Sequence, residues 1–175
     1  MSIGNFHRDV ERGKPAERFF ERYCSKQNLK CIDVRNNPKY QNIDSDYIVD
    51  DQKWEVKYNL LFAEKGRQGE CHRIELYYDD KPKGWWWYCK ADWFCFVRWD
   101  NSGAILIENN DAYKLFINNA ITNGDHSYNG DFRFDYTKDK RPWGYITITT
   151  MRIYMEDLEK AGVNFKRVVK RRRIN

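Results

Sequence analysis

The stretch 42–58, NIDSDYIVDDQKWEVKY, constrains the fold of this chain more than any other stretch. Apolar and charged residues alternate on both sides of a polar centre, which is the pattern of a β-hairpin. We expect the first strand over residues 44–49, the connection over 50–53 and the second strand over 54–58. Residues two apart on one strand, and their cross-strand partners, share a face of the sheet. The pattern therefore predicts a charged face of Asp44, Asp46, Glu55 and Lys57 and an apolar face of Tyr47, Val49, Trp54 and Val56.

The register of this hairpin decides which charged residues meet. With Asp51 and Gln52 as the two turn residues, Asp46 lies opposite Lys57. Three carboxylates and one ammonium on one face repel, shift one another's pKa and call for a counter-ion. The ordinary alternative is a solvated strand face with a surface ion pair. A different register could put Asp44 in the place of Asp46, and a slip of one residue would send every side chain to the other face.

Length and charge indicate one domain with a basic end. The chain has 175 residues, about one domain, and is long enough to bury a core. Its 7 Trp, 12 Tyr and 10 Phe favour a core built on aromatic rings. We expect a single domain over residues 1–165 and a basic tail over 166–175. A basic tail favours a polyanion partner, or is a solvated terminus. Its candidate nucleic-acid-binding residues are Lys170, Arg171, Arg172 and Arg173, preceded by Lys166 and Arg167.

Cysteine usage favours a reducing compartment. The five cysteines form no CxxC pair and no Cys/His spacing typical of zinc. An odd count without a signal peptide favours free thiols and the cytoplasm, which would be the host cytoplasm for a phage-encoded chain. No apolar run approaches the roughly 18 residues that a membrane helix needs, so we expect no membrane association.

The rest of the chain predicts helices around an antiparallel meander. We expect an irregular arm or short turn over residues 1–13, a helix over 15–27 that begins at Pro15, a strand over 29–34 and a loop over 59–69. A third strand over 70–78 follows, then a short helix or turn over 85–90. The later elements are strands over 91–97, 104–107 and 145–149, a long loop over 122–142 with a strand near 132–136, a helix over 111–121 with Asp111 as its N-cap, and a helix over 155–161 that ends at Gly162.

The charged face has the spacing D-x8-E-x-K, from Asp46 through Glu55 to Lys57. A hairpin brings Asp46 and Glu55 to diagonal positions on one face, where two carboxylates can hold Mg²⁺, or Mn²⁺ in its place. The cation would polarise a phosphate oxygen and lower the pKa of a bound water. Lys57 could orient or activate that water, or neutralise charge on phosphorus. The backbone carbonyl of Val56 could add an oxygen ligand.

At these residues the chain resembles the PD-(D/E)XK nuclease superfamily, in particular small phage- or mobile-element-type endonucleases. Asp46 stands where that family keeps its metal-binding Asp, and Glu55 and Lys57 where it keeps its E-x-K pair. Ser45 stands where the family nominally has Pro. The resemblance covers roughly residues 14–100. It implies an α/β fold with a central mixed β-sheet flanked by helices. The implied restriction-endonuclease-like core is a helix, a three-strand antiparallel meander, a helix and a strand.

Two further residues enter through the same resemblance. Glu17, in GKPAERFF, resembles the helix glutamate that many members place beside the metal, and solvated helix surface is its ordinary alternative. Lys90, in CKADWFCFV, resembles a polar residue ahead of the family's fourth strand. Glu75 is either an additional metal or water ligand or, as we favour, an exposed strand acid paired with Arg73 or a lysine.

The aromatic run and one histidine have mainly structural explanations. Residues 85–87 are three consecutive Trp, which cannot all share one face, so some belong to the core and the others could stack on bases. His72 shares a strand face with Ile74 and is expected to be a packed or surface histidine.

The resemblance implies a metal-dependent endonuclease that hydrolyses phosphodiester bonds, with DNA as the expected nucleic acid. A homodimer is the assembly that small nucleases of this kind often form. One alternative is a catalytically inactive nucleic-acid-binding or protein-inhibitor module on the same scaffold. Another is a protein-interaction module that uses its aromatic surface. Cleavage that depends on a divalent cation separates the first hypothesis from both alternatives.

Overall fold

The computed structural model describes residues 3–63, 69–123, 133–141 and 144–169, which form an α/β fold around a nine-stranded mixed β-sheet. The helices are α1 (Ile3–Lys26), α2 (Pro38–Gln41), α3 (Asp111–Asn123) and α4 (Met155–Lys160), with a 3-10 turn η1 (Trp85–Trp87). The strands are β1 (Cys31–Asp33), β2 (Tyr47–Val49), β3 (Gln52–Ala63), β4 (Gly69–Tyr78), β5 (Trp93–Arg98), β6 (Gly103–Glu108), β7 (Arg133–Arg141), β8 (Gly144–Tyr154) and β9 (Phe165–Val169). The expected fold class, α/β with a mixed sheet, is confirmed at this level.

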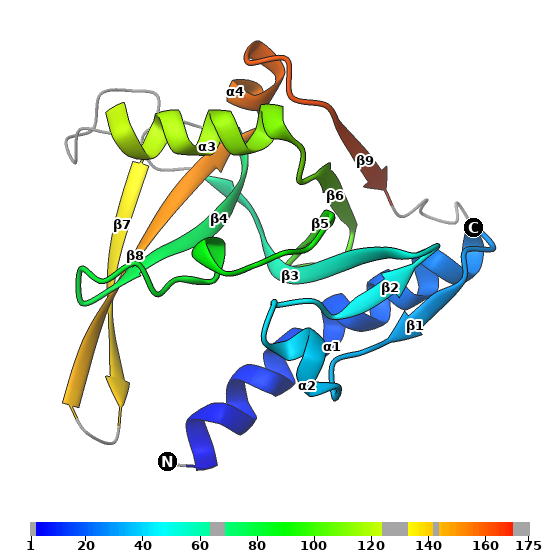
Figure 1. Ribbon diagram of the computed structural model, residues 1–175, viewed down its shortest axis with the longest axis horizontal. Coiled ribbons are helices and arrows are strands. Elements are labelled where there is room, and N and C mark those ends of the chain that lie inside the picture. Colours follow the sequence, from blue (N-terminus) through cyan, green and yellow to red (C-terminus); the bar gives the residue numbers. More distant parts are fainter. Residues whose placement is uncertain (1–2, 64–68, 124–132, 142–143, 170–175) are drawn as a thin grey trace.

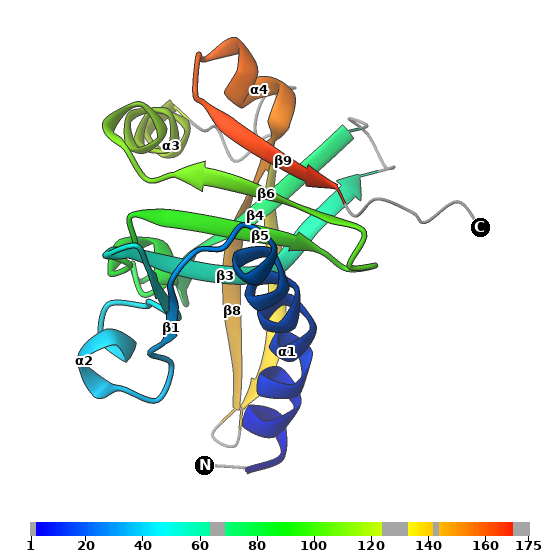
Figure 2. The same cartoon turned by 90° about the vertical axis from the view of Figure 1, so that its right-hand side faces the viewer.

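The strand order is β7-β8-β4-β3-β5-β6-β9, with β2 paired to β3 and β1 paired to β2. The β3–β5 pair is parallel and the other pairs are antiparallel, which makes the sheet mixed. In Figures 1 and 2, α3 lies above β3 and β5, and α1 lies below them. Figure 1 also shows the β7–β8 hairpin projecting from the sheet at the lower left.

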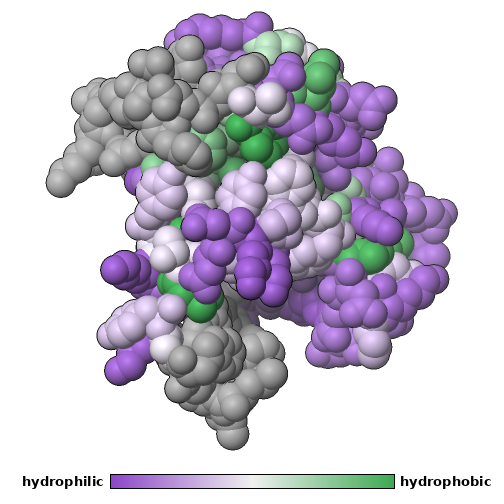
Figure 3. All heavy atoms as spheres, turned by 60° about the vertical axis from the view of Figure 1, so that its left-hand side comes forward, coloured by the Kyte–Doolittle hydropathy of each residue, from purple (hydrophilic) through white to green (hydrophobic). Residues whose placement is uncertain are grey.

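Two apolar clusters cover opposite faces of the sheet. Along β5, Phe94 and Phe96 belong to the cluster that includes α3, whereas Cys95 and Val97 belong to the cluster that includes α1. This division follows from the alternation of side chains along a strand. Figure 3 shows one face of the molecule, on which hydrophilic residues dominate and apolar residues form small separate patches. Among the described residues, no helix is both long and apolar enough to cross a membrane.

Helix α1 begins earlier than the sequence predicts. It starts at Ile3, so the expected arm over residues 3–13 is wrong, and Pro15 lies inside the helix instead of at its first position. The helix is anchored by Ala16, Phe20 and Cys24, which are buried against the apolar face of the hairpin. Local propensity is a weak prior that tertiary packing overrides, even at a proline.

The hairpin has the expected faces but another register. Tyr47 pairs with Trp54 and Val49 with Gln52, so the turn residues are Asp50 and Asp51 and not Asp51 and Gln52. Both turn residues have positive φ, 47° and 66°, which a two-residue type I′ hairpin requires and which Asp tolerates. The change of register amounts to two positions along one strand, so it leaves every side chain on its expected face.

Several strands are longer than their sequence pattern predicts. β3 continues to Ala63, through part of the expected loop over 59–69. β7, a mostly polar strand, runs to residue 141 because it pairs with β8 along its whole length. β8 runs to residue 154 because its second half also pairs with β4 and buries Met151 and Ile153. β9 pairs with β6, so residues 166–169 belong to the sheet and not to a tail.

Two helix ends show how local polar groups set boundaries. Asn110 caps α3, since its Oδ1 accepts a hydrogen bond from the Tyr113 N–H at 3.1 Å, so Asp111 is not the N-cap. Gly162 follows α4 with φ 71°, as a residue that ends a helix in the left-handed region does. The five cysteines are free thiols.

Candidate active site

The candidate site begins where the chain enters β2. The Asp46 N–H still donates to the Trp54 carbonyl at 2.9 Å, as in a strand pair. At the next position the Asp46 side chain replaces a backbone partner, because its Oδ2 accepts a hydrogen bond from the Val56 N–H at 2.9 Å. Asp44, two residues earlier, has a positive φ of 50°, so the chain turns away from β3 at this point. The open edge of β3 therefore faces carboxylates in place of a neighbouring strand.

Lys57 joins the acids into one cluster. Its Nζ lies 2.5 Å from Glu55 Oε1 and 3.2 Å from Asp44 Oδ2, and 5.1 Å from the centre of the Trp85 ring. The four side chains of the predicted charged face thus share one face, and we call Asp44, Asp46, Glu55 and Lys57 the acid–lysine cluster. The two acids that the sequence left as alternatives are both present, with different contacts.

Glu55 is the most deeply buried acid of the cluster. Its side chain is 3% exposed. Its Oε1 contacts Lys57, whereas its Oε2 has no hydrogen-bond partner among the described residues. Burying a carboxylate oxygen without a partner costs free energy, because hydration is lost and nothing replaces it. An oxygen of this kind fits a site that receives a cation or a hydrogen-bond donor.

Burial raises the pKa of both main acids. The pKa of Asp46 rises to about 6, because burial outweighs the Lys57 ammonium and the Val56 N–H. Burial also raises the pKa of Glu55 well above its usual value, opposed by Lys57 and assisted by the carboxylates of Asp46 and Asp44. With all groups ionised, three carboxylates around one ammonium carry an excess of negative charge. The cluster therefore favours an additional positive charge, either a proton or a cation.

Lys57 is held in its charged form. Burial lowers the pKa of Lys57, but the carboxylates of Glu55, Asp44 and Asp46 outweigh burial and raise the pKa well above its usual value. An ammonium donates hydrogen bonds and cannot accept a proton. In this arrangement Lys57 is suited to holding an anionic oxygen or orienting a water, and not to removing a proton from it.

The backbone of Val56 points to the same edge as Asp46. The N–H and C=O of one strand residue point to the same side of the strand. Because the Val56 N–H donates to Asp46, its carbonyl is directed to that open edge and away from β5. Carboxylate and carbonyl oxygens are the ligands that Mg²⁺ prefers. Asp46, Glu55 and the Val56 carbonyl together fit such an ion.

A complete protein cage for a metal is not formed. Among the residues that the structure describes, no three His, Cys, Asp or Glu side chains are grouped so that they could hold a metal ion. The Lys57 ammonium instead lies within contact distance of both Glu55 and Asp44. Mg²⁺ usually binds through one or two carboxylates together with water and substrate phosphate, so two acids and one carbonyl are sufficient for it.

Glu17 lies close enough to influence the cluster but has another partner. It forms an ion pair with Arg35, whose guanidinium also contacts Asp33 at 2.6 Å and Glu21 at 3.3 Å. The charge of Glu17 still contributes to the raised pKa of Asp46. Glu17 therefore lies beside the cluster, and its carboxylate is paired with the Arg35 guanidinium.

The segment after η1 holds the loop that carries Asp44. The Lys90 N–H donates to the Ile43 carbonyl at 2.9 Å, and the Cys89 thiol donates to the Asp44 carbonyl at 3.3 Å. The side chain of Lys90 is exposed. Lys90 therefore contributes a backbone contact to the site. It lies ahead of β5, as the sequence predicts.

Glu75 is paired, but with a tyrosine. Its Oε2 accepts a hydrogen bond from the Tyr78 hydroxyl at 2.7 Å, so the expected pairing with Arg73 or a lysine is wrong. Arg73 contacts Asp135 instead, at 3.5 Å. Burial, together with the nearby carboxylates of Asp44, Glu75 and Glu55, raises the pKa of Tyr88 to about 12 against the opposing effect of Lys57. Glu75 therefore belongs to the surroundings of the cluster.

The sequence missed the aromatic side chains that surround the cluster. Tyr78 and Tyr88 lie at least twenty residues beyond the hairpin stretch 42–58, and no spacing pattern connects them to it. Trp85 is 3% exposed and lies beside Lys57, whereas Trp87 is 43% exposed and its Nε1 donates to the Leu76 carbonyl at 2.6 Å. The three tryptophans are thus divided between core and surface, as their sequence requires.

His72 is a packed histidine, as expected. It is fully buried, stacks on Phe96 with 4.1 Å between ring centres, and its Nε2 lies 2.8 Å from the Tyr113 hydroxyl. Burial lowers its pKa to about 3. It lies in the core and not in the cluster.

The predicted nucleic-acid-binding residues 170–173 lie outside the described residues. A comparison of the chain with protein-family models, with curated proteins and with solved structures gives no match. The fold and the site define the chain as an α/β protein with a half-buried acid–lysine cluster at the open edge of strand β3 in a mixed sheet.

Proposed function

We propose that the chain is a metal-dependent nuclease that hydrolyses phosphodiester bonds, with DNA as its substrate. The observation that carries the proposal is Glu55, a buried carboxylate whose Oε2 lacks a partner, next to Asp46 and Lys57. Burying Glu55 and partly burying two further acids beside it is unfavourable for structural reasons alone, since apolar residues would pack there at lower cost. A cluster of this composition suits a cation and a phosphate.

The arrangement of elements also supports the PD-(D/E)XK resemblance. A helix, α1, precedes the antiparallel strands β1, β2 and β3, and β5 then pairs with β3 in parallel. The family's helix ahead of the last core strand corresponds here to the 3-10 turn η1. The proposed core is therefore a restriction-endonuclease-like one with a shortened second helix.

In this proposal, two acids and a backbone carbonyl bind the metal, and the lysine binds the phosphate. Asp46, Glu55 and the Val56 carbonyl would hold Mg²⁺ or Mn²⁺, which supplies Lewis-acid polarisation of a phosphate oxygen when bound. The Lys57 ammonium donates to the phosphate and offsets the negative charge that develops on it during attack. The Trp85 ring beside Lys57 covers part of the ammonium and strengthens this interaction, although the Lys57 side chain is still 23% exposed. Glu17 would take part only if its contact with Arg35 opened.

The test is cleavage of plasmid and of synthetic branched DNA with Mg²⁺, Mn²⁺ or EDTA. Asp46→Asn, Glu55→Gln and Lys57→Met should each lower cleavage by at least about 100-fold, as expected for groups that stabilise developing charge. Asp51→Asn is the matched control, since it removes an exposed carboxylate from the turn of the same hairpin. Equal cleavage by wild type and by folded Glu55→Gln would contradict the proposal that the acid–lysine cluster hydrolyses the phosphodiester bond.

One observation favours the second candidate, an inactive binding or inhibitor module. Lys57 already contacts two of the acids, so the cluster has an internal counter-ion. The discriminating result is DNA binding that remains unchanged in Glu55→Gln, without cleavage under any divalent cation. A dimer that cuts two strands is an extension of the leading proposal, and light scattering with and without DNA tests it.

A further inference from the structure

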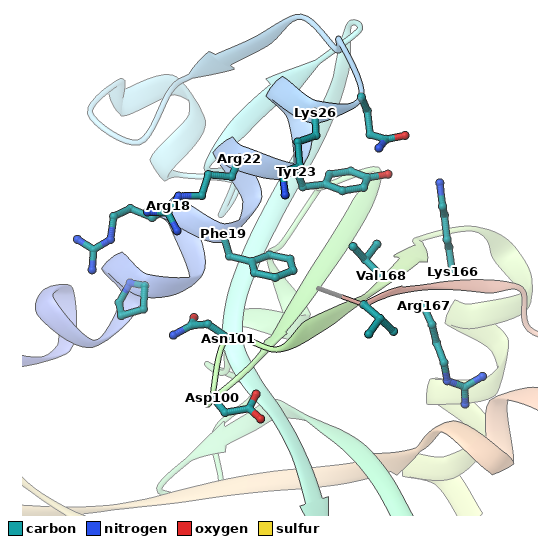
Figure 4. A pocket seen from close by; sticks show the side chains of 13 residues that line it. Arg18, Phe19, Arg22, Tyr23, Lys26, Asp100, Asn101, Lys166, Arg167 and Val168 are labelled. Carbon is teal, nitrogen blue, oxygen red and sulfur yellow. The ribbon is translucent and has the colours of Figure 1, made fainter. Parts of the chain in front are cut away.

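A groove lined by basic and aromatic residues lies between α1 and β9, away from the acid–lysine cluster. Its volume is about 750 Å³. Figure 4 shows that α1 contributes Arg18, Arg22 and Lys26 to one side of it, while β9 contributes Lys166 to the other. α1 packs on the sheet face of Trp54 and Val56, opposite the face that carries Glu55 and Lys57. The groove is therefore a second site.

The three basic residues of α1 form a regular stripe. They recur every four residues, so their positions lie about 6 Å apart along the helix axis. This repeat is comparable to the distance between successive phosphates in an extended strand. No carboxylate among the described residues lies within ion-pair distance of Arg18, Arg22 or Lys26. Their charges remain available to a ligand.

The other lining residues carry fewer available charges. Arg167 contacts Glu159 at 3.0 Å and Glu70 at 3.3 Å, so its charge is already paired within the protein. Asp100 is the acid of the lining, and its Oδ1 accepts hydrogen bonds from the N–H and the hydroxyl of Ser102. The groove therefore has a net positive charge.

Two aromatic rings lie among the basic groups. Phe19 and Tyr23 line the groove and are partly exposed, and the Lys166 Nζ lies 5.9 Å from the centre of the Tyr23 ring. Figure 4 shows both rings directed into the groove from α1. A basic track with interspersed rings is the arrangement by which proteins hold single strands, with phosphates on the cations and bases on the rings.

Along the chain, the strand that lines the groove is followed by the most basic stretch of the sequence. Val169, the last residue of β9, lines it, and the next four residues in the chain are Lys170, Arg171, Arg172 and Arg173. At its other end, Glu17 adjoins Arg18 in the sequence and influences the pKa of Asp46. Helix α1 thus connects the groove with the acid–lysine cluster.

We propose that this groove binds a single nucleic-acid strand, with its phosphates along Arg18, Arg22 and Lys26 and its bases against Tyr23 and Phe19. The choice of nucleic acid over other polyanions rests on the proposed function, whereas the binding itself is measured without catalysis. A strand held here would run along α1 toward the cluster, so the groove would select substrates that contain an unpaired segment.

The experiment measures binding of fluorescent oligo-dT of 20 nucleotides by anisotropy, in EDTA, over a series of salt concentrations. The triple variant Arg18→Ala, Arg22→Ala, Lys26→Ala should flatten the salt slope by about 2, since each single-strand phosphate contact contributes about 0.7. When salt is lowered from 1 M to 0.1 M, the affinity of the wild type should therefore rise roughly 100-fold more than the affinity of the triple variant. The matched control, Lys81→Ala, Lys114→Ala, Lys138→Ala, removes the same charge from exposed positions elsewhere.

A second pair of variants tests for bases in the groove. Tyr23→Leu should weaken oligo-dT binding by about tenfold, as expected for loss of one stacked base, while Tyr23→Phe should bind as wild type does. Heparin should not distinguish Tyr23→Leu from wild type. The proposal is overturned if the two triple variants bind alike, or if Tyr23→Leu changes oligo-dT and heparin binding equally.

Failure of the groove and failure of the proposed function give different results. Hydrolysis of bis(4-nitrophenyl) phosphate with Mn²⁺ reports on the acid–lysine cluster without needing the groove. Groove variants should retain that hydrolysis and lose strand binding. Hydrolysis absent in wild type, with groove-dependent binding intact, would remove the nuclease proposal and leave a strand-binding protein.

Discussion

The carboxylate of Asp46 lowers the stability of the fold at neutral pH. Its folded pKa of about 6 lies above its ordinary value of 3.8. The folded state therefore binds protons more tightly, and stability from this group is present below pH 3.8 and is lost as the pH rises through 6. At neutral pH the ionised carboxylate is a cost that a bound cation would offset.

Asp46→Asn should therefore stabilise the protein at pH 7, by roughly 1–2 kcal/mol after allowance for partial exposure. The amide oxygen can still accept the Val56 N–H. Urea denaturation at pH 7 and at pH 3.5 checks this, because the gain should disappear at the lower pH. Asp51→Asn is the control, and a gain of the same size there would contradict the explanation.

Lys57 is expected to behave in the opposite way. Lys57→Met leaves Glu55 and Asp44 without their ammonium partner, which should destabilise the protein by about 2–3 kcal/mol, less than for a fully buried pair. Adding Glu55→Gln to it should recover a large part of that loss, because the unpaired buried charge is gone. A double-mutant cycle in urea measures the coupling, and strictly additive losses would mean that the pair does not interact.

At the scale of elements, η1 is positioned by a close approach to β4. A Cβ at Gly84 would lie 2.1 Å from the Glu75 carbonyl oxygen and 2.5 Å from the Leu76 nitrogen. No residue other than glycine fits there, since the obstacle is backbone and cannot move like a flexible side chain. The position of Trp85, and with it the environment of Lys57, depends on this contact.

Gly84→Ala should accordingly destabilise the protein by about 3 kcal/mol and lower cleavage, because η1 must move away from β4. Gly13→Ala is a matched control: it lies within α1, where its Cβ would meet Glu17 Oε1 at an ordinary 3.5 Å. It should stabilise by about 1 kcal/mol through the helix propensity of Ala. Thermal melts of both variants test the pair, and equal melting temperatures would refute the role of Gly84.

The elements that could be predicted from the sequence are those with a periodic apolar face. Tyr47, Val49, Trp54 and Val56 alternate and are buried as expected, and the strand over 70–78 is found within one residue of its bounds. The expected hairpin register is wrong because Asp50 and Asp51 adopt positive φ and form the turn. The alternation of apolar and polar residues carries no information about φ. β7 was underestimated because a polar, solvated strand leaves no apolar pattern.

The site was predictable only where it is local in sequence. The acids and lysine of one hairpin share a face by geometry alone, so spacing found them. Tyr78 and Tyr88 come from other elements and meet the cluster only through the tertiary fold. The same holds for the partner of Glu17, since Arg35 reaches it across the contact between α1 and β1.

For the whole molecule, the sheet separates two apolar clusters, and the one on the α3 side contacts a buried imidazole. His72 has a pKa of about 3 in the folded protein against 6.5 ordinarily. The unfolded state therefore binds the proton more tightly between these values, and stability falls as the pH drops below 6.5. This dependence is opposite in sign to that of Asp46.

His72→Gln should lose this sensitivity to acid. The difference in unfolding free energy between wild type and His72→Gln should change by about 3 kcal/mol between pH 7 and pH 4, in favour of the variant at low pH. Tyr113→Phe removes the hydroxyl near Nε2 but keeps the imidazole buried, so it should retain the wild-type pH dependence. Parallel pH profiles for wild type and His72→Gln would contradict the assignment.

Lys57 has a further consequence, which concerns the order in which the site is assembled. The ammonium that pairs with Glu55 and Asp44 belongs to a side chain of the protein, so dialysis against a chelator cannot remove it. The protein should therefore fold and keep its melting temperature in EDTA. An incoming divalent ion must compete with this resident charge, so the ion alone should bind weakly. A phosphate that attracts Lys57 away from Glu55 would relieve the competition, and metal and substrate should then bind with positive cooperativity.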